Sequence, residues 1–259
     1  MLRKEFQKFK NFVFDLDGTI WYWSELIPGV KEVISVIREA GKEIFFVTNN
    51  SMLSPDGFVK KLNEFGLSTD LSHLTCSNEI ILTYLQQRGA KRIFSLSLKE
   101  ADSYFTKNGM ELSEDPDYVV IIYNEESEDK LKKAAELMAR GVPAVTNATG
   151  KKWVLKDKIL PGTGIFVEKV EKLSGKKVEV VGKPSDFSVD YVRKKCNLNP
   201  EETVFFGDSL NSDRIFARKL GWSFAFVLTG EYSKEDLEKI PETEQSDFVL
   251  NSMKEINIH

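Results

Sequence analysis

Asp15 and Asp17 are the residues best placed for chemistry, because they lie two residues apart after the apolar run 12–14, where a buried strand gives way to a glycine turn at Gly18. A β-strand sends alternate side chains to the same face, so both carboxylates would project from the carboxyl end of a buried strand. In open α/β sheets that end is where ligands bind. Two buried like charges are costly unless a cation lies between them or one stays protonated. Either arrangement suits catalysis, whereas the alternative is a turn in which the aspartates only cap backbone groups.

Polar groups also end three later apolar runs. Because the carboxyl ends of parallel strands lie along one edge of a sheet, we expect these groups to converge on the two aspartates. Taken singly, each has an ordinary explanation as a turn, a solvated lysine or a helix cap. Four carboxylates at one edge would give an oxygen-rich site of the kind that suits Mg²⁺. The groups are Thr48, Asn49 and Asn50 after 43–47, Lys183 after 178–182, and Asp208 after 203–207, with Asp213 at the start of the next helix.

The elements that must position these groups alternate between strand and helix. In the first third, the pattern predicts a strand ending at Asp15, a helix from 30 to Gly41, a strand over 43–48, and helices over 55–65 and 78–88. The middle repeats the alternation on a smaller scale, with strands at 92–96, 118–122 and 143–146 and helices over 127–140 and 165–173.

The last third returns to longer apolar strands over 178–183, 203–208 and 224–230, which resemble the opening third. We therefore predict an α/β protein with a Rossmann-like parallel-sheet core formed by 1–88 and 180–259. Residues 89–179 would form an inserted α/β domain.

Composition excludes several classes of partner. The chain has 259 residues and a net charge of −4, which gives no reason to expect binding to nucleic acid. The basic N-terminus lacks the apolar stretch of a signal peptide, and no apolar run is long enough to span a bilayer. We expect a cytoplasmic protein, monomer or homodimer, whose partner is a small molecule and not a membrane.

Four motifs resemble those of the haloacid dehalogenase superfamily of phosphotransferases, in order and in spacing. Two further stretches, 27–29 and 227–230, resemble its p-nitrophenylphosphatase and phosphoglycolate phosphatase branch, which includes NagD-type nucleotidases. That branch carries a large α/β cap between its second and third motifs, which matches the predicted insertion. The motifs are Asp15-Leu-Asp-Gly-Thr19, Phe46-Val-Thr-Asn-Asn-Ser51, Gly182-Lys-Pro184, and Gly207-Asp208 with Asp213.

The resemblance implies a role for each residue at the reaction centre. Asp15 would attack phosphorus and form an aspartyl-phosphate, and Asp17 would protonate the leaving oxygen and then activate water. Thr48 and nearby main-chain amides would hold phosphoryl oxygens, with Asn49 as a further phosphate contact. Lys183 would offset the negative charge that develops in the transition state.

The resemblance also implies the ligands of a magnesium ion. Mg²⁺ would be held by Asp15, the main-chain carbonyl of Asp17, and Asp208. Asp213 would help directly or through water. Held in this way, Asp15 stays ionised, whereas Asp17 among other carboxylates is expected to have a raised pKa.

The sequence departs from the family in the cap. The branch often shows a T-N-x-D segment there, but this chain ends the corresponding segment at Thr149. The next residues, Lys151, Lys152 and Trp153, either meet the leaving group or lie in a solvated loop. The run 21–23, two tryptophans around a tyrosine, either lines the entrance or packs beneath the cap. Whether Thr149 and Lys151 contact substrate is left open.

We therefore expect a Mg²⁺-dependent phosphomonoesterase for small metabolites such as sugar phosphates, phosphoglycolate, nucleoside monophosphates or p-nitrophenyl phosphate. A phosphomutase or phosphotransferase would use the same pocket with a hydroxyl acceptor in place of water. A phosphometabolite-binding protein without catalysis is a third alternative. A dehalogenase is disfavoured because it has no leaving oxygen for Asp17 to protonate.

Overall fold

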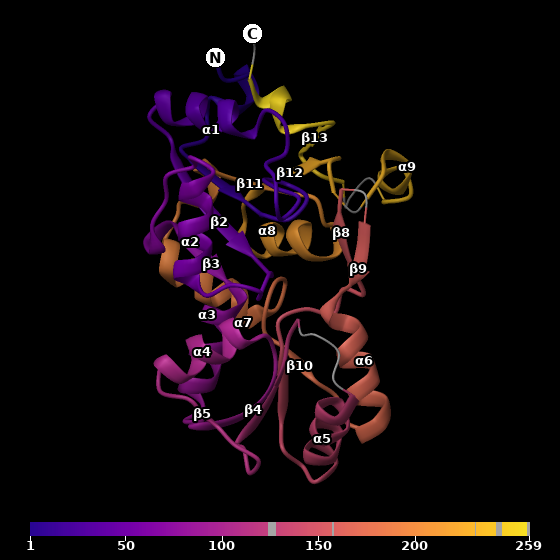
Figure 1. Cartoon of the computed structure of the whole chain (residues 1–259). Helices are drawn as coiled ribbons and strands as arrows, with labels where there is room; N and C mark the ends of the chain where they lie inside the picture. Colours follow the sequence, from indigo (N-terminus) through magenta and orange to yellow (C-terminus); the bar gives the residue numbers. More distant parts are fainter. Residues whose placement is uncertain (124–127, 157, 231, 242–244, 258–259) are drawn as a thin grey trace.

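Two parallel β-sheets, each covered by helices, make up the computed structural model, which describes residues 1–123, 128–156, 158–230, 232–241 and 245–257 (Figure 1). The larger sheet has the strand order β13-β12-β11-β1-β2-β3. All of its neighbouring strands are parallel. Its strands are β1 (Asn11–Phe14), β2 (Glu43–Thr48), β3 (Leu74–Cys76), β11 (Thr203–Gly207), β12 (Ser223–Val227) and β13 (Phe248–Leu250).

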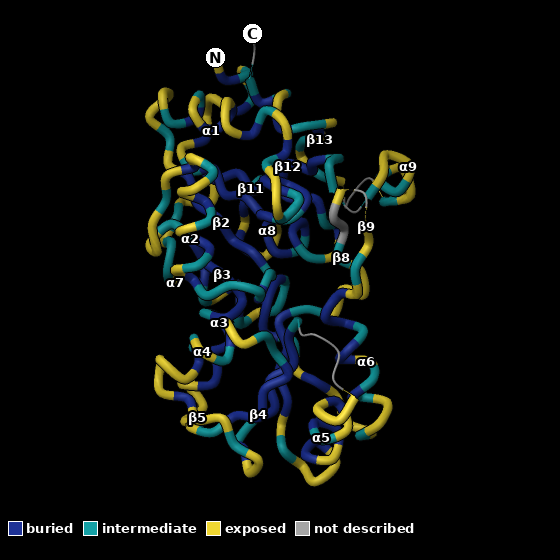
Figure 2. Tube along the Cα trace, viewed as in Figure 1, coloured by how far each residue is buried: buried dark blue, intermediate teal, exposed yellow. Residues whose placement is uncertain are grey.

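The strands of the larger sheet are apolar throughout because helices cover both faces. Phe12 and Phe14 of β1 pack toward α1 (Val30–Glu39) and α2 (Pro55–Glu64), whereas Val13 packs toward α7 (Asp186–Cys196) and α8 (Ile215–Leu220). Parallel strands that are buried on both faces have this continuous apolar pattern. Figure 2 shows the strands in dark blue between helices that are partly exposed.

The smaller sheet has the order β10-β7-β6-β4-β5 and is also parallel. Helices α5 and α6 pack on one face and helices α3 and α4 on the other. Its elements are α3 (Ser77–Gln87), β4 (Arg92–Leu96), α4 (Lys99–Lys107), β5 (Glu111–Leu112), β6 (Tyr118–Ile121), α5 (Glu128–Ala139), β7 (Ala144–Thr146), α6 (Thr163–Ser174) and β10 (Glu179–Val180). The predicted α/β fold with an inserted α/β cap is confirmed.

An antiparallel hairpin, β8 (Lys152–Leu155) and β9 (Lys158–Pro161), rises from the cap toward the larger sheet (Figure 1). Its base meets the loop after β1, where Trp153 packs edge-to-face on Trp23 with 5.7 Å between ring centroids. Lys156 forms an ion pair of 2.8 Å with Glu25 of the same loop. The alternative of a solvated loop at 151–153 was therefore wrong for Lys152 and Trp153, which belong to a strand.

The prediction that 178–183 forms a strand of the larger sheet was also wrong. β10 pairs with β7 of the smaller sheet, and the main-chain N–H of Val181 donates to Thr146. Lys183 thus lies in the connection from β10 to α7, not at the end of a strand of the larger sheet. A short apolar run indicates a buried strand but carries no information about which sheet it joins.

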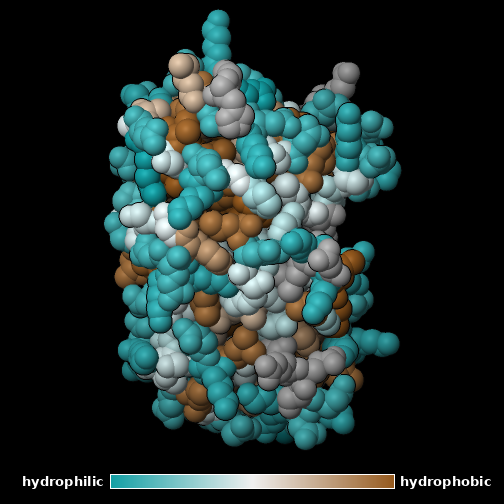
Figure 3. Space-filling model, turned by 45° about the horizontal axis from the view of Figure 1, so that its top comes forward, coloured by the Kyte–Doolittle hydropathy of each residue, from teal (hydrophilic) through white to brown (hydrophobic). Residues whose placement is uncertain are grey.

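The other predicted helices and strands differ from the structure by a few residues at their ends. The predicted start of α5 at residue 127 lies outside the described residues. Most of the surface in Figure 3 is hydrophilic, with apolar residues showing in small patches. The remaining α-helix, α9 (Lys234–Leu237), is short, and a π-helical segment over Leu210–Arg214 leads into α8. Among the helices that the structure describes, none is both long and apolar enough to cross a membrane.

Candidate active site

The carboxyl ends of three adjacent strands of the larger sheet form the floor of the site. Asp15 follows β1, Thr48 ends β2 and Asp208 follows β11, and these strands are neighbours in the order β11-β1-β2. The main-chain N–H of Asp15 continues the ladder by donating to Phe206, at 2.9 Å. The parallel order therefore brings together residues that are far apart in the sequence, as expected from their positions at strand ends.

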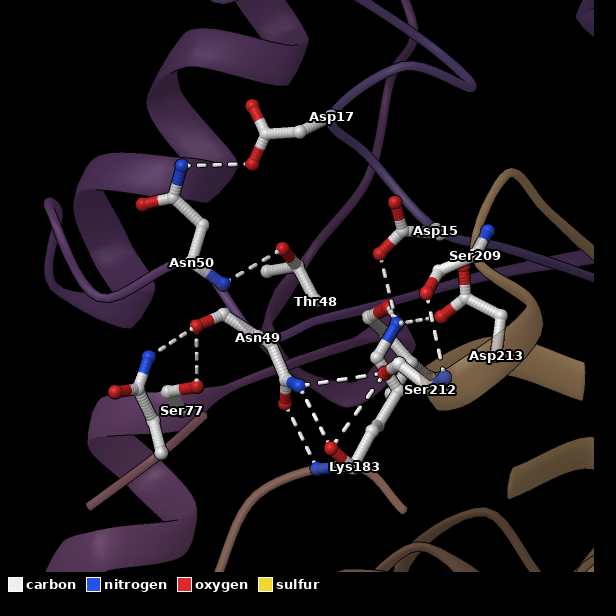
Figure 4. A network of polar contacts seen from close by, with 12 residues as sticks. Asp15, Asp17, Thr48, Asn49, Asn50, Ser77, Lys183, Ser209, Ser212 and Asp213 are labelled. Atoms are coloured by element: carbon white, nitrogen blue, oxygen red, sulfur yellow. Dashed lines mark hydrogen bonds and ion pairs between the residues drawn. The ribbon is translucent and has the colours of Figure 1, made fainter. Parts of the chain in front are cut away.

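Lys183 is the centre of the polar network in Figure 4. Its Nζ donates to Asp15 Oδ1 at 2.7 Å, to Asp213 Oδ1 at 2.7 Å and to the Val47 carbonyl at 2.9 Å. All three donors of the ammonium group are thus used while the side chain is almost completely buried. Burial would lower the pKa of Lys183, but Asp15 and Asp213 outweigh it and hold this pKa above its ordinary value.

Three carboxylates lie around this ammonium group. Asp15, Asp208 and Asp213 each offer one carboxylate oxygen, and these oxygens lie within 4.8 Å of one another. Burial, with added repulsion from Asp213 and Asp17, raises the pKa of Asp15 to about 8, although Lys183 opposes the shift. One ammonium group cannot balance three carboxylates, so the cluster has an excess of negative charge that a divalent cation would neutralise.

Glycines leave space for two of these carboxylates. A Cβ atom at Gly230 would lie 1.7 Å from Asp208 Oδ2, and one at Gly18 would lie 2.5 Å from the same atom. At Gly207 a Cβ would lie 2.5 Å from Asp213 Oδ2. The main chain thus approaches the carboxylates as closely as glycine allows. A compact set of oxygen donors in such a cradle fits Mg²⁺.

Asp17 points to a different part of the pocket (Figure 4). Its Oδ2 accepts from Asn50 Nδ2 at 2.8 Å, and its Oδ1 accepts from Trp21 Nε1 at 2.9 Å. Burial raises the pKa of Asp17, although the Asn50 and Trp21 hydrogen bonds oppose the shift. Its carboxylate is not part of the three-carboxylate cluster. The two aspartates of the first motif are therefore held apart, one by a lysine and one by neutral donors.

The side chains of Thr48 and Asn49 in the loop 48–50 form hydrogen bonds within the site. Asn49 Oδ1 accepts from the main-chain N–H of Lys183, and Asn49 Nδ2 donates to the carbonyl of Lys183, both at 2.8 Å. Thr48 Oγ1 accepts from the main-chain N–H of Asn50 at 3.0 Å. These side chains do not cap α2, since Ser54 does so. Asn49 positions Lys183 in this structure, and its phosphate contact stays a prediction.

A cavity of about 440 Å³ opens above these groups. The site residues line its floor, and Thr149, Lys151 and Trp153 of the cap line its other side. Lys151 also pairs with Glu168 at 2.8 Å. Of the run 21–23, Trp21 is buried beneath the site, whereas the half-buried Trp23 contacts Trp153. The predicted site residues thus surround one cavity, with Lys183 reaching it from the connection to the cap.

Sequence reasoning placed Asn50 near the two aspartates but missed the supporting roles of Trp21 and Asn147. Trp21 and Asn50 hold Asp17, and the Trp21 spacing of four residues from Asp17 was a signal that could have been used. Asn147 of the cap donates from Nδ2 to the Asn49 carbonyl at 2.5 Å. No pattern in the sequence links positions so far apart, because the contact exists only when the two sheets meet.

Comparison with known proteins gives matches over nearly the whole chain. Residues 12–111 match the model of the haloacid dehalogenase-like hydrolases, and residues 180–256 match that of the HAD-hydrolase-like proteins. A 4-nitrophenylphosphatase of Schizosaccharomyces pombe is 26% identical, with 98% of this chain and 95% of that protein covered. The sugar phosphatase AraL of Bacillus subtilis is 27% identical over 95% of this chain and 91% of that protein. The crystal structure of a 4-nitrophenylphosphatase from Thermotoga maritima superposes with a TM-score of 0.88 at 29% identity, covering 98% of both chains.

Proposed function

The chain belongs to the haloacid dehalogenase-like hydrolases and is a phosphatase of phosphoric monoesters, and from this premise we propose that it works through an aspartyl-phosphate on Asp15 with Mg²⁺ as cofactor. The observation that carries the proposal is that Asp15 and Asp17 are held in separate environments. Asp15 lies in the cluster around Lys183, while Asp17 is held separately by neutral donors. One carboxylate is thus placed to attack and the other to exchange a proton.

In the first step an oxygen of Asp15 attacks phosphorus, and the bond from phosphorus to the leaving alcohol breaks. Asp17 gives its proton to the leaving oxygen, which departs as the neutral alcohol. Burial raises the pKa of Asp17, which favours the protonated form needed for this role. The hydrogen bonds from Asn50 and Trp21 fix the carboxyl group of Asp17 in one orientation, so the proton donor is already in place before the reaction begins.

In the second step Asp17 takes a proton from water, and the water oxygen attacks phosphorus. The bond from phosphorus to Asp15 breaks, which releases inorganic phosphate and restores the carboxylate. Lys183 stays bound to Asp15 through both steps and offsets the charge that develops on the phosphoryl group. Thr48 lies beside these groups in the cavity and supplies a phosphate contact together with nearby main-chain amides.

The ligands of Mg²⁺ in this proposal are the carboxylates of Asp15, Asp208 and Asp213, with the main-chain carbonyl of Asp17 added from the family resemblance. When bound, the ion neutralises the carboxylates and draws charge from the phosphoryl oxygens. The excess of three carboxylates over one ammonium group supports this assignment.

We further propose that 89–179 serves as the cap domain that recognises the leaving group, with 1–88 and 180–259 as the catalytic core, except that α3 and β10 at these two boundaries pack with the smaller sheet and belong to the cap. Thr149, Lys151 and Trp153 line the cavity opposite the reaction centre, which supports this division. The substrates would be small phosphorylated metabolites. A cytoplasmic location and a monomeric or dimeric state stay predictions.

The experiment is phosphate release from p-nitrophenyl phosphate and a panel of metabolite phosphates, with Mg²⁺ or EDTA, for the wild type and Asp15→Asn. The matched control is Asp190→Asn, an exposed aspartate of α7 that pairs with Arg193. We expect turnover that needs Mg²⁺, is lost in Asp15→Asn and is unchanged in Asp190→Asn. Turnover in EDTA, or in Asp15→Asn, would contradict the proposal, and a second phosphorylated product would indicate a phosphotransferase instead.

A further inference from the structure

A second cavity continues the active site toward the smaller sheet. It has a volume of about 160 Å³ and shares Asp17, Asn50 and Trp153 with the larger cavity. Tyr123 and Asn147 of the cap line its far side. On the proposed function, Asp17 protonates the leaving oxygen, so the remainder of the leaving group must lie next to Asp17. This side cavity borders Asp17 and is therefore the place where that group fits.

Asn147 presents an unused acceptor at this cavity. Its Nδ2 donates to the main-chain carbonyl of Asn49, which also accepts from Ser77 Oγ at 2.7 Å. Because a carbonyl can only accept, the amide must place its nitrogen there and its Oδ1 on the other side. Asn147 is 2% exposed, and within the described parts of the chain its Oδ1 has no hydrogen-bond partner. A buried acceptor left in this state is costly unless a ligand supplies a donor.

Trp153 presents an unused donor. Its ring packs edge-to-face on Tyr123 at 5.5 Å as well as on Trp23, which fixes its orientation. The indole Nε1 is buried and forms no hydrogen bond of regular geometry with any residue that the structure describes. Trp153 and Asp17 both line this side cavity. The donor therefore stands beside the group that protonates the leaving oxygen.

We propose that Trp153 and Asn147 select phosphate esters whose leaving alcohol carries a hydroxyl group on the carbon next to the ester carbon, as in a small polyol. That hydroxyl oxygen lies close to the ester oxygen, so it can accept from Trp153 Nε1. The same hydroxyl or the next one along the polyol donates to Asn147 Oδ1.

Other classes of leaving group satisfy this pair less well. A plain alkyl group leaves both the donor and the acceptor unpaired. A carboxylate, as in phosphoglycolate, can accept from Trp153 but has no hydrogen to give to Asn147. A site built to hydrogen-bond a hydroxyl group discriminates strongly against analogues that lack it. The aromatic faces of Trp153 and Tyr123 suit the C–H side of a polyol.

The test compares kcat/KM for glycerol 3-phosphate, propyl phosphate and phosphoglycolate, with p-nitrophenyl phosphate as the reference for catalytic competence. Glycerol 3-phosphate and propyl phosphate have the same carbon chain and differ in their hydroxyl groups. We expect the wild type to prefer glycerol 3-phosphate over propyl phosphate by at least about tenfold. Trp153→Phe keeps a ring but removes the donor, and we expect it to reduce this preference at least about fivefold.

The matched control is Trp222→Phe, which makes the same change at a buried tryptophan of the core far from the cavity. We expect it to keep the wild-type preference. A wild-type preference near one, a higher kcat/KM for phosphoglycolate, or an unchanged preference in Trp153→Phe would overturn the inference. If p-nitrophenyl phosphate is still hydrolysed in those cases, the proposed function stands. If no ester is hydrolysed by the wild type, the proposed function fails first.

Discussion

Replacing Lys183 with methionine tests whether one ammonium group holds the reaction centre together. The change keeps most of the side-chain volume but removes the three hydrogen bonds from Nζ. It leaves Asp15 and Asp213 buried with no cation between them. We expect a loss of stability in the metal-free protein, because their mutual repulsion and desolvation are no longer offset.

The size of the loss follows from the burial of the pair. Lys183 and Asp213 have side chains that are 1% and 3% exposed, so the pair is screened very little by water. Removing one partner of such a buried pair costs about 3–5 kcal/mol of unfolding free energy. In a chain of this size that corresponds to a fall in Tm of roughly 6–20 °C. Lys183→Met would also abolish measurable turnover, since the phosphoryl charge loses its counter-charge.

The assay is thermal unfolding in EDTA, followed by circular dichroism, at about pH 9, which is above the pKa of about 8 of Asp15 in the metal-free fold. The double variant Lys183→Met with Asp213→Asn removes one of the two repelling carboxylates, and we expect it to recover part of the lost Tm. A Tm of Lys183→Met within about 2 °C of the wild type would refute the reasoning. A double variant less stable than Lys183→Met would refute the assignment of the loss to carboxylate repulsion.

Three further predictions concern the metal, the general acid and the glycine cradle. In the metal-free fold the pKa of Asp15 is raised from 3.8 to about 8, so protonation of Asp15 stabilises the folded state, and this stabilisation is lost as pH rises from about 4 to 8. We therefore expect the Tm measured in EDTA to fall over this pH range. We expect the increase in Tm that Mg²⁺ produces to grow with pH. Asp17→Asn removes the proton donor of the first step, and we expect kcat/KM to fall about 10²–10⁴-fold for alkyl phosphates but less for p-nitrophenyl phosphate, whose leaving group needs less protonation. Equal losses of kcat/KM for the two kinds of ester would count against the assignment. Gly230→Ala places a methyl group 1.7 Å from Asp208 Oδ2 and leaves Lys183 and its partners in place, so we expect the variant to bind Mg²⁺ more weakly than the wild type. Calorimetry measures the affinity, and an unchanged affinity would show that Asp208 is not a ligand.

The sequence was enough to predict four of the six strands of the larger sheet, β1, β2, β11 and β12, and the residues at its edge, but not the short strands β3 and β13. Apolar runs that end in polar residues mark buried parallel strands, and the parallel order then places Asp15, Thr48 and Asp208 together. Motif spacing added Asp213 and Lys183. Helix ends were also predictable where a local signal existed, as with Ser54 and Pro55 at the start of α2.

The rest could not be predicted because it depends on contacts between distant segments. The run 178–183 has the same composition whichever sheet it joins, and only its pairing with β7 decides the matter. The hairpin of β8 and β9 is short, and the position of Trp153 depends on Trp23, which comes from another part of the chain. The hydrogen bonds of Asn49 to Lys183 likewise form only after both sheets have folded.

The central claim is that Asp15 carries the phosphoryl group during turnover. Asp17→Asn should slow the second step, because the carboxylate that takes the proton from water is lost, so the phosphoenzyme should accumulate with p-nitrophenyl phosphate and Mg²⁺. The direct measurement is acid quenching of this variant followed by mass spectrometry of its peptides. We predict a phosphoryl group on the peptide that contains Asp15, at the position of that aspartate. Release of p-nitrophenol at a measurable rate with no phosphorylated peptide, or with the phosphoryl group on another residue, would contradict the mechanism.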